Sequence, residues 1–449
     1  MRKLRIAAGL VVAASLAGLG AISPVAGATI DHASAKHVKL AELKDPLATN
    51  GDQFGHNVAT DAAGTEALVG AHLSDSGAGR AYLYVSSHGK WPTKPTATFA
   101  DPVAGTYHFG YNVALSSNGT TAYVTADQQP VGARAGAGEV FVYASSHGVW
   151  PKHPTSTVSD PGTGTDDYFG VGISVSSDGG TLVVGAPGTT RHGTSEVGAT
   201  YVYTASHGKL PSAPSATIDS PDPIRGFFGY SVSVSDNSRG KGVVIIGAYV
   251  TSVGAISDEG AAYIYDSKGL HSWALAKGGS LKDPGTLADD FFGAVVTIDA
   301  AGTVAMAGAQ DETEKGTGDA GAVFTYVLKS GTWKLGQTLD GPADSAANFA
   351  SPSISANGKV AVMGAGNEQV DGNSYAGEAF VYVGTGSTYS LGASIPDPTG
   401  GNPTGQEYFG APSAVSSTGD LSVIAAPATT GSDGNPGPGA VYIYNTTPS

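Results

Sequence analysis

Cysteine is absent from this 449-residue chain. Disulfide bonds, thiolate metal sites and cysteine nucleophiles are therefore excluded together. Charge is also sparse, because only 14% of the residues are charged, and the 38 acidic residues outnumber the 23 basic ones. The resulting net charge of −15 argues against a nucleic acid partner, since phosphate binding requires a basic patch.

Long apolar runs are missing after residue 28. In that part of the chain, no apolar segment approaches the roughly 18 residues of a membrane span. At the start of the chain, three basic residues precede an apolar run from Ile6 to Leu19, and the small residues Ala26-Gly27-Ala28 follow. This layout predicts a secretory signal peptide over residues 1–28, with an uncleaved membrane anchor as the alternative. We therefore expect a secreted, extracellular or cell-surface protein whose mature chain has no membrane span.

Glycine is abundant, with 66 residues, and it marks an internal repeat. A phenylalanine followed by glycine, or once by alanine, recurs at Phe54-Gly55, Phe109-Gly110, Phe169-Gly170, Phe228-Gly229, Phe292-Gly293, Phe349-Ala350 and Phe409-Gly410. In each copy a small pair such as Gly70-Ala71 or Gly185-Ala186 then closes an apolar run. Next, a glycine stands three residues before an aromatic-x-Tyr triplet, as Gly79 does before Tyr82. The chain is therefore built from seven copies of one unit.

Each unit has the pattern of four short strands. Segments such as Ser231–Ser235 alternate polar and apolar residues, which is typical of a strand with two unlike faces. The second segment, such as Thr181–Val184, is continuously apolar, as expected for a strand covered on both faces. The third carries the aromatic-x-Tyr triplet, and a fourth runs into an Asp-Pro type of turn. Seven four-stranded units that pack face to face around an axis form a β-propeller.

The two ends of the repeat region indicate how the ring closes. The region begins with a spare fourth strand at Val38–Leu43, and the last unit ends on its third strand at Tyr442–Tyr444. Pairing these two strands would complete the last blade and remove the exposed sheet edges. We therefore predict an all-β fold: a seven-bladed β-propeller of four-stranded blades over residues 38–444, with the ring closed by the N-terminal strand.

The unit resembles a known repeat. Phe169-Gly170 followed by Gly185-Ala186-Pro187 is similar to the FG-GAP repeat of integrin α-chain propellers and of many secreted bacterial proteins. The resemblance extends from about Val38 to Tyr444. It implies a propeller whose function is adhesion or ligand binding, although such modules also occur in enzymes.

Integrin-like copies carry a DxDxDG calcium loop between the first and second strands. The corresponding segments here include Asp61-Ala62-Ala63-Gly64 and Ser116-Ser117-Asn118-Gly119, which lack the alternating oxygen ligands that calcium needs. We therefore do not carry the calcium role over. We expect that the protein requires no cofactor. A divalent cation bound elsewhere in the protein is the alternative, and its ligands are unknown.

Catalytic motifs of the common hydrolase, nucleotide-binding and metalloprotease kinds are missing. An aspartate at or near an Asp-Pro turn recurs in all seven units, which indicates turn capping rather than catalysis. An enzyme would need a cluster of unlike residues in one or two blades near the axis, and we expect mostly repeated positions. A hydrolase or lyase acting on extracellular polysaccharide is the alternative to a non-catalytic binding propeller.

Most acidic residues fall in the loops from the fourth strand to the next first strand and in the loops from the second strand to the third. These two sets of loops should share one face of the ring, and we expect this acidic face to recognise an extracellular protein or glycan. An acid stands two residues before the repeat phenylalanine in four units, and an aromatic residue precedes it directly in four. In unit five, further acids follow the Gly-Ala pair. These candidate ligand-binding residues are Asp52, Asp167, Asp290, Glu407, Tyr168, Phe227, Phe291, Tyr408, Asp311, Glu312 and Glu314. The alternative role for the aromatic rings is packing between blades. The alternative for the acidic residues is that they only keep the loops solvated. We expect a monomer whose binding weakens with salt.

Overall fold

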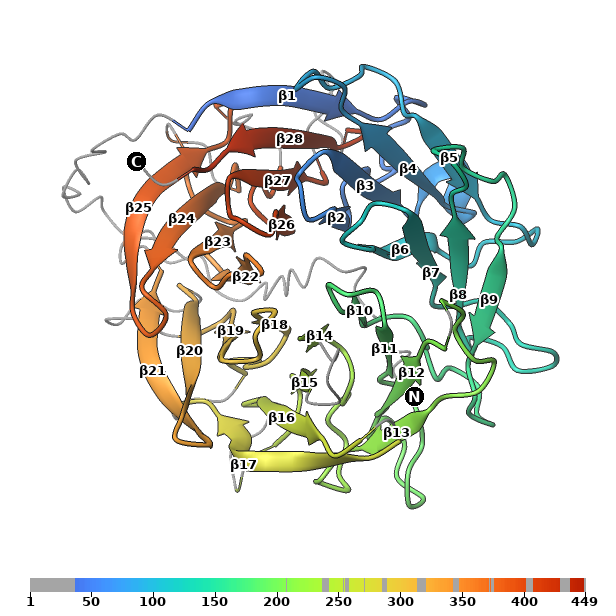
Figure 1. The fold of residues 1–449 in the computed structure, drawn as a ribbon, viewed down its shortest axis with the longest axis vertical. Helices are drawn as coiled ribbons and strands as arrows, with labels where there is room; N and C mark the ends of the chain where they lie inside the picture. Colours follow the sequence, from blue (N-terminus) through green and yellow to red (C-terminus); the bar gives the residue numbers. More distant parts are fainter. Residues whose placement is uncertain are drawn as a thin grey trace, which may run out of the picture.

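A computed structural model describes residues 37–447, except 207, 236–241, 253, 255–257, 270, 285–288, 313–319, 342–346, 371, 373–374, 401–406 and 429–436. The predicted signal peptide lies outside the described residues. Seven antiparallel sheets of four strands each surround a central axis (Figure 1), which confirms the predicted seven-bladed propeller. Within the described residues, no helix is long and apolar enough to cross a membrane.

In every blade, four strands follow one another from the axis outward. They are β2 (Val58–Thr60), β3 (Glu66–Ala71), β4 (Arg80–Val85) and β5 (Ala97–Ala100) in blade one; β6 (Phe109–Leu115), β7 (Thr121–Ala126), β8 (Glu139–Ala144) and β9 (Ser156–Ser159) in blade two; β10 (Ile173–Val175), β11 (Thr181–Ala186), β12 (Ala199–Thr204) and β13 (Ala216–Asp219) in blade three; β14 (Val232–Val234), β15 (Val243–Ala248), β16 (Ala261–Ser267) and β17 (Trp273–Lys282) in blade four; β18 (Val295–Ile298), β19 (Val304–Ala309), β20 (Ala322–Lys329) and β21 (Thr332–Asp340) in blade five; β22 (Phe349–Ile354), β23 (Val360–Ala365), β24 (Glu378–Gly384) and β25 (Tyr389–Pro396) in blade six; and β26 (Ser413–Val415), β27 (Leu421–Ala426), β28 (Ala440–Asn445) and β1 (Lys39–Lys44) in blade seven. One short helical turn, α1 (Ser74–Gly77), lies in the loop between β3 and β4.

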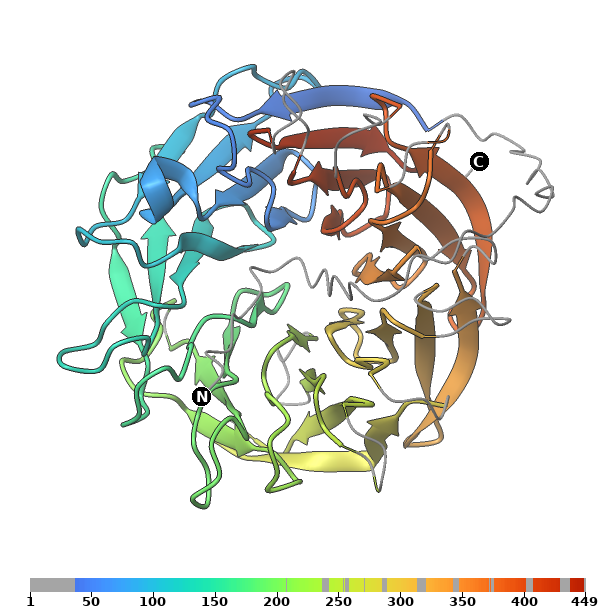
Figure 2. The same cartoon turned by 180° about the vertical axis from the view of Figure 1, so that it is seen from behind.

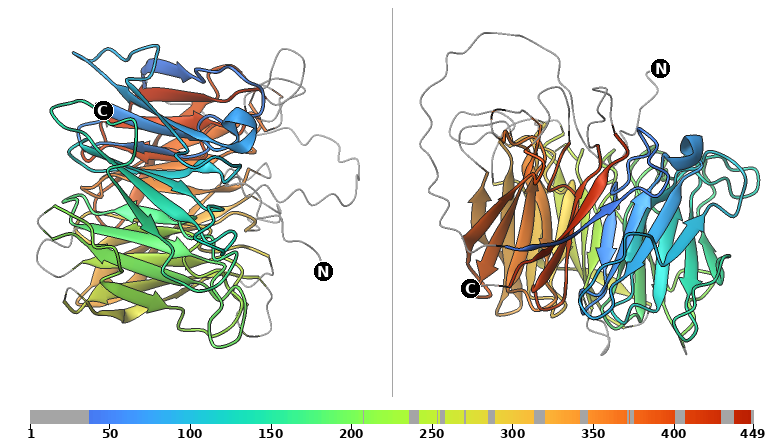
Figure 3. Two further views of the ribbon diagram at one scale, coloured as in Figure 1. Left: turned by 90° about the vertical axis from the view of Figure 1, so that its right-hand side faces the viewer. Right: turned by 90° about the horizontal axis from the view of Figure 1, so that it is seen from above.

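The two faces of the disc carry different connections. Loops from an outer strand to the next inner strand, and loops from the second to the third strand, emerge on one side, which we call the loop face. The tight turns between first and second strands emerge on the opposite side, the hairpin face. α1 belongs to the loop face, which is turned toward the viewer in Figure 2 and seen edge-on in Figure 3.

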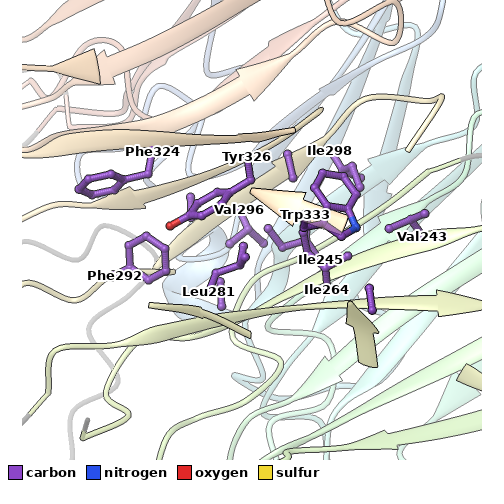
Figure 4. Close-up of a cluster of buried hydrophobic side chains, with 14 of the residues drawn as sticks. Val243, Ile245, Ile264, Leu281, Phe292, Val296, Ile298, Phe324, Tyr326 and Trp333 are labelled. Carbon is purple, nitrogen blue, oxygen red and sulfur yellow. The ribbon is translucent and has the colours of Figure 1, made fainter. Parts of the chain in front are cut away.

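The hydrophobic core lies between neighbouring blades, not within a single one. In one cluster, Ile245 and Ile264 of blade four pack with Phe292 and Tyr326 of blade five (Figure 4). Strands such as β15 and β19 are buried along their whole length, as the continuous apolar runs predict. Since every blade presents both of its faces to a neighbour, the core consists of seven clusters, one between each pair of neighbouring blades.

The glycine before each third strand is required by the contact between blades. Gly79 has a φ of +88° and forms a parallel bridge with Phe109 of the next blade. A side chain at this position would collide with the Phe109 carbonyl. Gly439 of blade seven makes the same close approach to Phe54 of blade one. The glycine in the repeat therefore allows each blade to dock on the next, including across the point of closure.

Strand β1 closes the ring as predicted. It pairs antiparallel with β28 and places Leu43 opposite Val441. Leu43 is 1% exposed and packs with Phe54, Tyr84 and Ile443. The first described strand is thus the outer strand of the last blade.

Candidate functional site

A cavity with a volume of about 330 Å³ lies on the axis, at its loop-face end. Its wall is made of the residues that begin the inner strand in every blade. Those residues are 56–58, 111–113, 171–173, 230–232, 294–296, 351–353 and 411–413. Because the same three positions contribute from all seven blades, differences at these positions decide what the cavity can bind.

The wall of this axial cavity combines rings and amides. Tyr111, Tyr230 and Tyr408 line it, and so do the amides of Asn57, Asn112, Asn348, Asn367 and Gln310. No lysine, arginine, aspartate or glutamate occurs among the described residues of the lining. A cavity of this kind suits a neutral, polar molecule with some apolar surface.

Hydrogen bonds hold part of the amide set in place. The Asn348 side chain donates to the Gln310 carbonyl and to the Asp311 carboxylate, both over 2.9 Å. The Asn367 side chain donates in turn to the Oδ1 atom of the Asn348 side chain. On the other side of the cavity, the Asn112 amide donates to the Val171 carbonyl over 2.8 Å and so bridges blades two and three. These contacts keep the lining ordered before a ligand arrives.

A group of histidines adjoins the cavity in blades one and two. The rings of His56 and His72 are 4.0 Å apart between centroids, and His72 is 5.2 Å from His108. Asp127 lies behind His108, with its Oδ1 atom 3.4 Å from the His108 Nδ1 atom. The sequence analysis did not predict this set of unlike residues, which the described residues bring together in blades one and two.

The sequence contains a signal for these residues that motif searches do not use. His56 and Tyr111 occupy the position two residues after the repeat phenylalanine, and His72 and Asp127 directly follow the small pair. Both positions differ from blade to blade. Comparing the seven copies for the positions that vary, rather than for those that recur, would have marked His56 and His72 as candidates, although not that they lie together.

Carboxyl pairs occupy the turns that lead into four of the blades. Asp45 pairs with Asp52, Asp160 with Asp167, Asp283 with Asp290, and Asp397 with Glu407. The first member caps its turn, as predicted: Asp45 accepts from the Leu47 amide and Asp397 from the Thr399 amide. The second member is the acid that stands two residues before the phenylalanine.

Burial of these pairs makes ionisation costly. Burial and the neighbouring aspartate raise the pKa of Asp52 and of Asp167 to about 6. Burial and a hydrogen bond with Glu407 raise the pKa of Asp397 to about 8. In blade five a third acid joins, so that ligand oxygens of Asp283, Asp290 and Glu312 lie within 4.8 Å of one another. These acids lie beneath the loop face and not on its surface.

The predicted binding residues are accordingly spread over different environments. Asp52, Asp167, Asp290, Glu312, Glu407, Phe227 and Tyr408 are buried, and Tyr168, Phe291 and Asp311 are half-buried. Glu314 lies outside the described residues. The structure brings Asp290 and Glu312 together, and the Tyr249 ring lies between Phe227 and Phe291, 5.8 and 6.0 Å from them. Asp52, Asp167 and Glu407 belong to separate blades, and Tyr408 alone of the predicted set lines the axial cavity.

Ion pairs neutralise four basic residues of the loop face. Arg191 pairs with Asp219 over 2.8 Å and Arg225 with Glu196 over 2.7 Å. Arg80 and Arg134 form similar pairs with Asp75 and Asp160. Exposed acids such as Asp166 and Asp289 remain on this face. The surface around the cavity is therefore acidic, although the cavity wall itself carries no acid among its described residues.

Comparison with known proteins agrees with this architecture. Residues 156–203, which run from β9 to β12, match the family model described as FG-GAP repeat. Among solved structures, Kuenenia stuttgartiensis hydrazine synthase is similar over 90% of this chain and 99% of that chain, with a TM-score of 0.53 and 13% sequence identity. At that identity the likeness concerns the fold alone. No curated protein sequence matches the chain at a significant level.

Proposed function

We propose that this chain, an FG-GAP-repeat β-propeller, is a secreted or cell-surface binding protein that takes a neutral sugar residue of an extracellular glycan into its axial cavity. The fold suggests a binding propeller, since the repeat and the seven-bladed ring are those of an interaction module. Binding sites favour variable loops on a rigid scaffold, which is how the loop face is built.

The uncharged, ring-and-amide lining of the cavity carries this proposal. Sugar hydroxyl groups both donate and accept hydrogen bonds, and the side chains of Asn57, Asn367 and Ser231 on the wall can do both. The C–H face of a sugar ring packs on aromatic side chains, and Tyr230 and Tyr408 supply such rings. The volume of about 330 Å³ lies at the lower end of the range for small-ligand sites, which suits one or two sugar units.

The acidic surface around the cavity restricts the kind of glycan. Asp166 and Asp289 are exposed on the loop face, and Glu196, Asp258 and Asp311 are half-buried there. A polyanionic chain would be repelled at this surface, whereas a neutral or amine-bearing chain could cross it. We therefore assign a neutral or cationic glycan in preference to a sulfated or uronic acid polymer.

The alternative, a hydrolase or lyase acting on polysaccharide, has the histidine group beside the cavity in its favour, but the described wall lacks the carboxyl groups of a typical hydrolase. Glycoside hydrolysis commonly uses two carboxyl groups on either side of the scissile bond. The described part of the cavity wall offers no carboxyl group, and the carboxyl pairs are buried beneath the loops.

A glycan array followed by calorimetric titration tests the proposal. We expect the protein to bind neutral or amine-bearing oligosaccharides, and Tyr230→Ala to weaken that binding at least about tenfold, or 1.4 kcal/mol. His147→Ala is the matched control, because His147 is an exposed ring on a hairpin-face turn. Binding to a neutral glycan should change little with salt. Binding only to cationic proteins, with a strong loss in salt, or an unaffected Tyr230→Ala variant, would overturn the proposal.

A further inference from the structure

The histidine group contains one imidazole ring, that of His56, whose protonation can be assigned. The His56 Nδ1 atom lies 2.8 Å from the backbone carbonyl of Tyr111. A carbonyl oxygen only accepts hydrogen bonds, so Nδ1 carries the proton and Nε2 has a free lone pair. Burial lowers the pKa of His56 to about 4, which keeps the ring neutral at neutral pH. Its Nε2 atom is buried and has no hydrogen-bond donor among the described residues.

His72 is more unusual, because neither of its nitrogens has a partner within the described part of the chain. The residue is 0% exposed, and both Nδ1 and Nε2 are buried without a hydrogen bond to any described residue. Burial, together with His56 and His108, lowers its pKa well below the ordinary value. Each buried polar group without a partner costs about 1–3 kcal/mol. Such a group calls for a specific explanation.

The third histidine is backed by a carboxyl group. Asp127 is 1% exposed, and its Oδ1 atom is 3.4 Å from the His108 Nδ1 atom. A carboxylate that holds one ring nitrogen turns the other toward its partner, and this arrangement recurs behind the histidine ligands of metal ions. The backbone carbonyl of Tyr111 has the same relation to His56. A hydrogen bond thus orients the His56 ring from behind, whereas the Asp127 carboxyl group lies next to the His108 ring without a hydrogen bond to it.

We propose that His56, His72 and His108 bind a transition-metal ion of the zinc class beside the axial cavity, with Asp127 as a positioning residue. Neutral imidazoles suit zinc, copper or nickel, and they do not suit calcium or magnesium, which prefer oxygen ligands. The ion would satisfy the lone pairs of His56 and His72 and remove the cost of burying them. The Asp127 carboxyl group would offset part of its charge.

Metal binding requires the rings to turn. Among the described residues, three ligand atoms lie within 4.8 Å of one another only in the carboxylate group of blade five. The His72 ring centroid is 4.0 Å from that of His56 and 5.2 Å from that of His108, so the proposal requires the His72 and His108 rings to rotate until their nitrogens face the free Nε2 atom of His56. Because His56 also lines the axial cavity, the bound ion would lie next to any ligand held there.

The test uses Zn²⁺ alone and does not depend on a glycan. The folded, chelator-treated protein is titrated with Zn²⁺ by calorimetry, and Co²⁺ reports the coordination through its visible absorption. We expect one Zn²⁺ per chain, an increase in the melting temperature, and weaker binding as acid protonates the ligands. His72→Gln and His56→Tyr should each lower the affinity at least a hundredfold.

These substitutions are chosen from the repeat itself. Gln310 stands in blade five where His72 stands in blade one, and Tyr111 stands in blade two where His56 stands in blade one. Both variants are therefore expected to fold, which circular dichroism verifies, and His108→Asn serves as a third if one does not. His147→Ala should bind Zn²⁺ like the wild type. Unchanged affinity in the folded His72→Gln and His56→Tyr variants, or a wild-type protein that binds no Zn²⁺, would refute the site. Failure of glycan binding would leave this result unaffected.

Discussion

Truncation of Leu43 tests whether the first strand holds the ring closed. Leu43 is 1% exposed, and it packs from β1 against Phe54, Tyr84, Val441 and Ile443 at the junction of blades one and seven. Leu43→Ala removes a fully buried side chain from a site with rigid neighbours. Loss of the burial energy accounts for about 2 kcal/mol. The cavity left behind raises the total to about 3 kcal/mol, within the range for buried leucines.

The same strand provides the matched control. Leu40 is 45% exposed, so Leu40→Ala should change stability by less than about 0.5 kcal/mol. Deleting residues 38–46 removes the whole strand and uncovers the β28 edge, which should lower the melting temperature much further and promote association through that edge.

Urea unfolding followed by tryptophan fluorescence measures these effects. Trp91, one of the four tryptophans whose emission follows unfolding, packs against the cluster that contains Leu43. The reasoning fails if Leu43→Ala is as stable as Leu40→Ala, or if the protein lacking residues 38–46 melts like the intact chain. Either result would mean that the other blade interfaces hold the ring without its outer seventh strand.

Two further predictions concern the carboxyl pairs and the repeat glycines. Because burial and Glu407 raise the pKa of Asp397 to about 8, the native state binds more protons than the unfolded state between about pH 4 and 8, and stability should fall as the pH rises through this window. Asp397→Asn mimics the protonated form. It should raise the free energy of unfolding by about 2 kcal/mol at pH 9 and leave it unchanged at pH 4. The gain at pH 9 is smaller than the full pKa shift implies, because solvent screens part of the interaction. Urea unfolding at both pH values measures this difference. The control is Asp340→Asn, because Asp340 is an exposed aspartate at the same repeat position. Equal gains in stability at pH 4 and pH 9 would contradict the reasoning. Gly198→Ala places a side chain against the Phe228 carbonyl of the next blade and should cost on the order of 3 kcal/mol or more. Gly179→Ala, at a positive φ with open space around it, should cost about 1 kcal/mol, and similar melting temperatures for the two variants would argue against the blade contact.

Much of the binding region could not be read from the sequence, for a physical reason. Asp52 and Asp167 were expected on an acidic surface, yet each turn folds back so that its two carboxyl groups meet beneath the loops. Loop composition indicates net charge, but whether a given carboxyl group faces solvent or a second carboxyl group depends on the path of the turn. The histidine group was missed because its members are contributed by separate loops of two blades.

The sequence alone determined the architecture. Seven copies of one unit fixed the number of blades, the apolar and aromatic patterns fixed the order of strands, and the unpaired first and last strands fixed the closure. These features are local and repeated, so each copy reinforces the same interpretation. The tertiary structure alone decided which variable positions meet around the axis, because ring closure brings His56, Tyr111, Tyr230 and Tyr408 to one cavity from segments far apart in the chain. A repeat specifies its scaffold many times over, whereas a binding site is made where the copies differ and is completed only when the ring is closed.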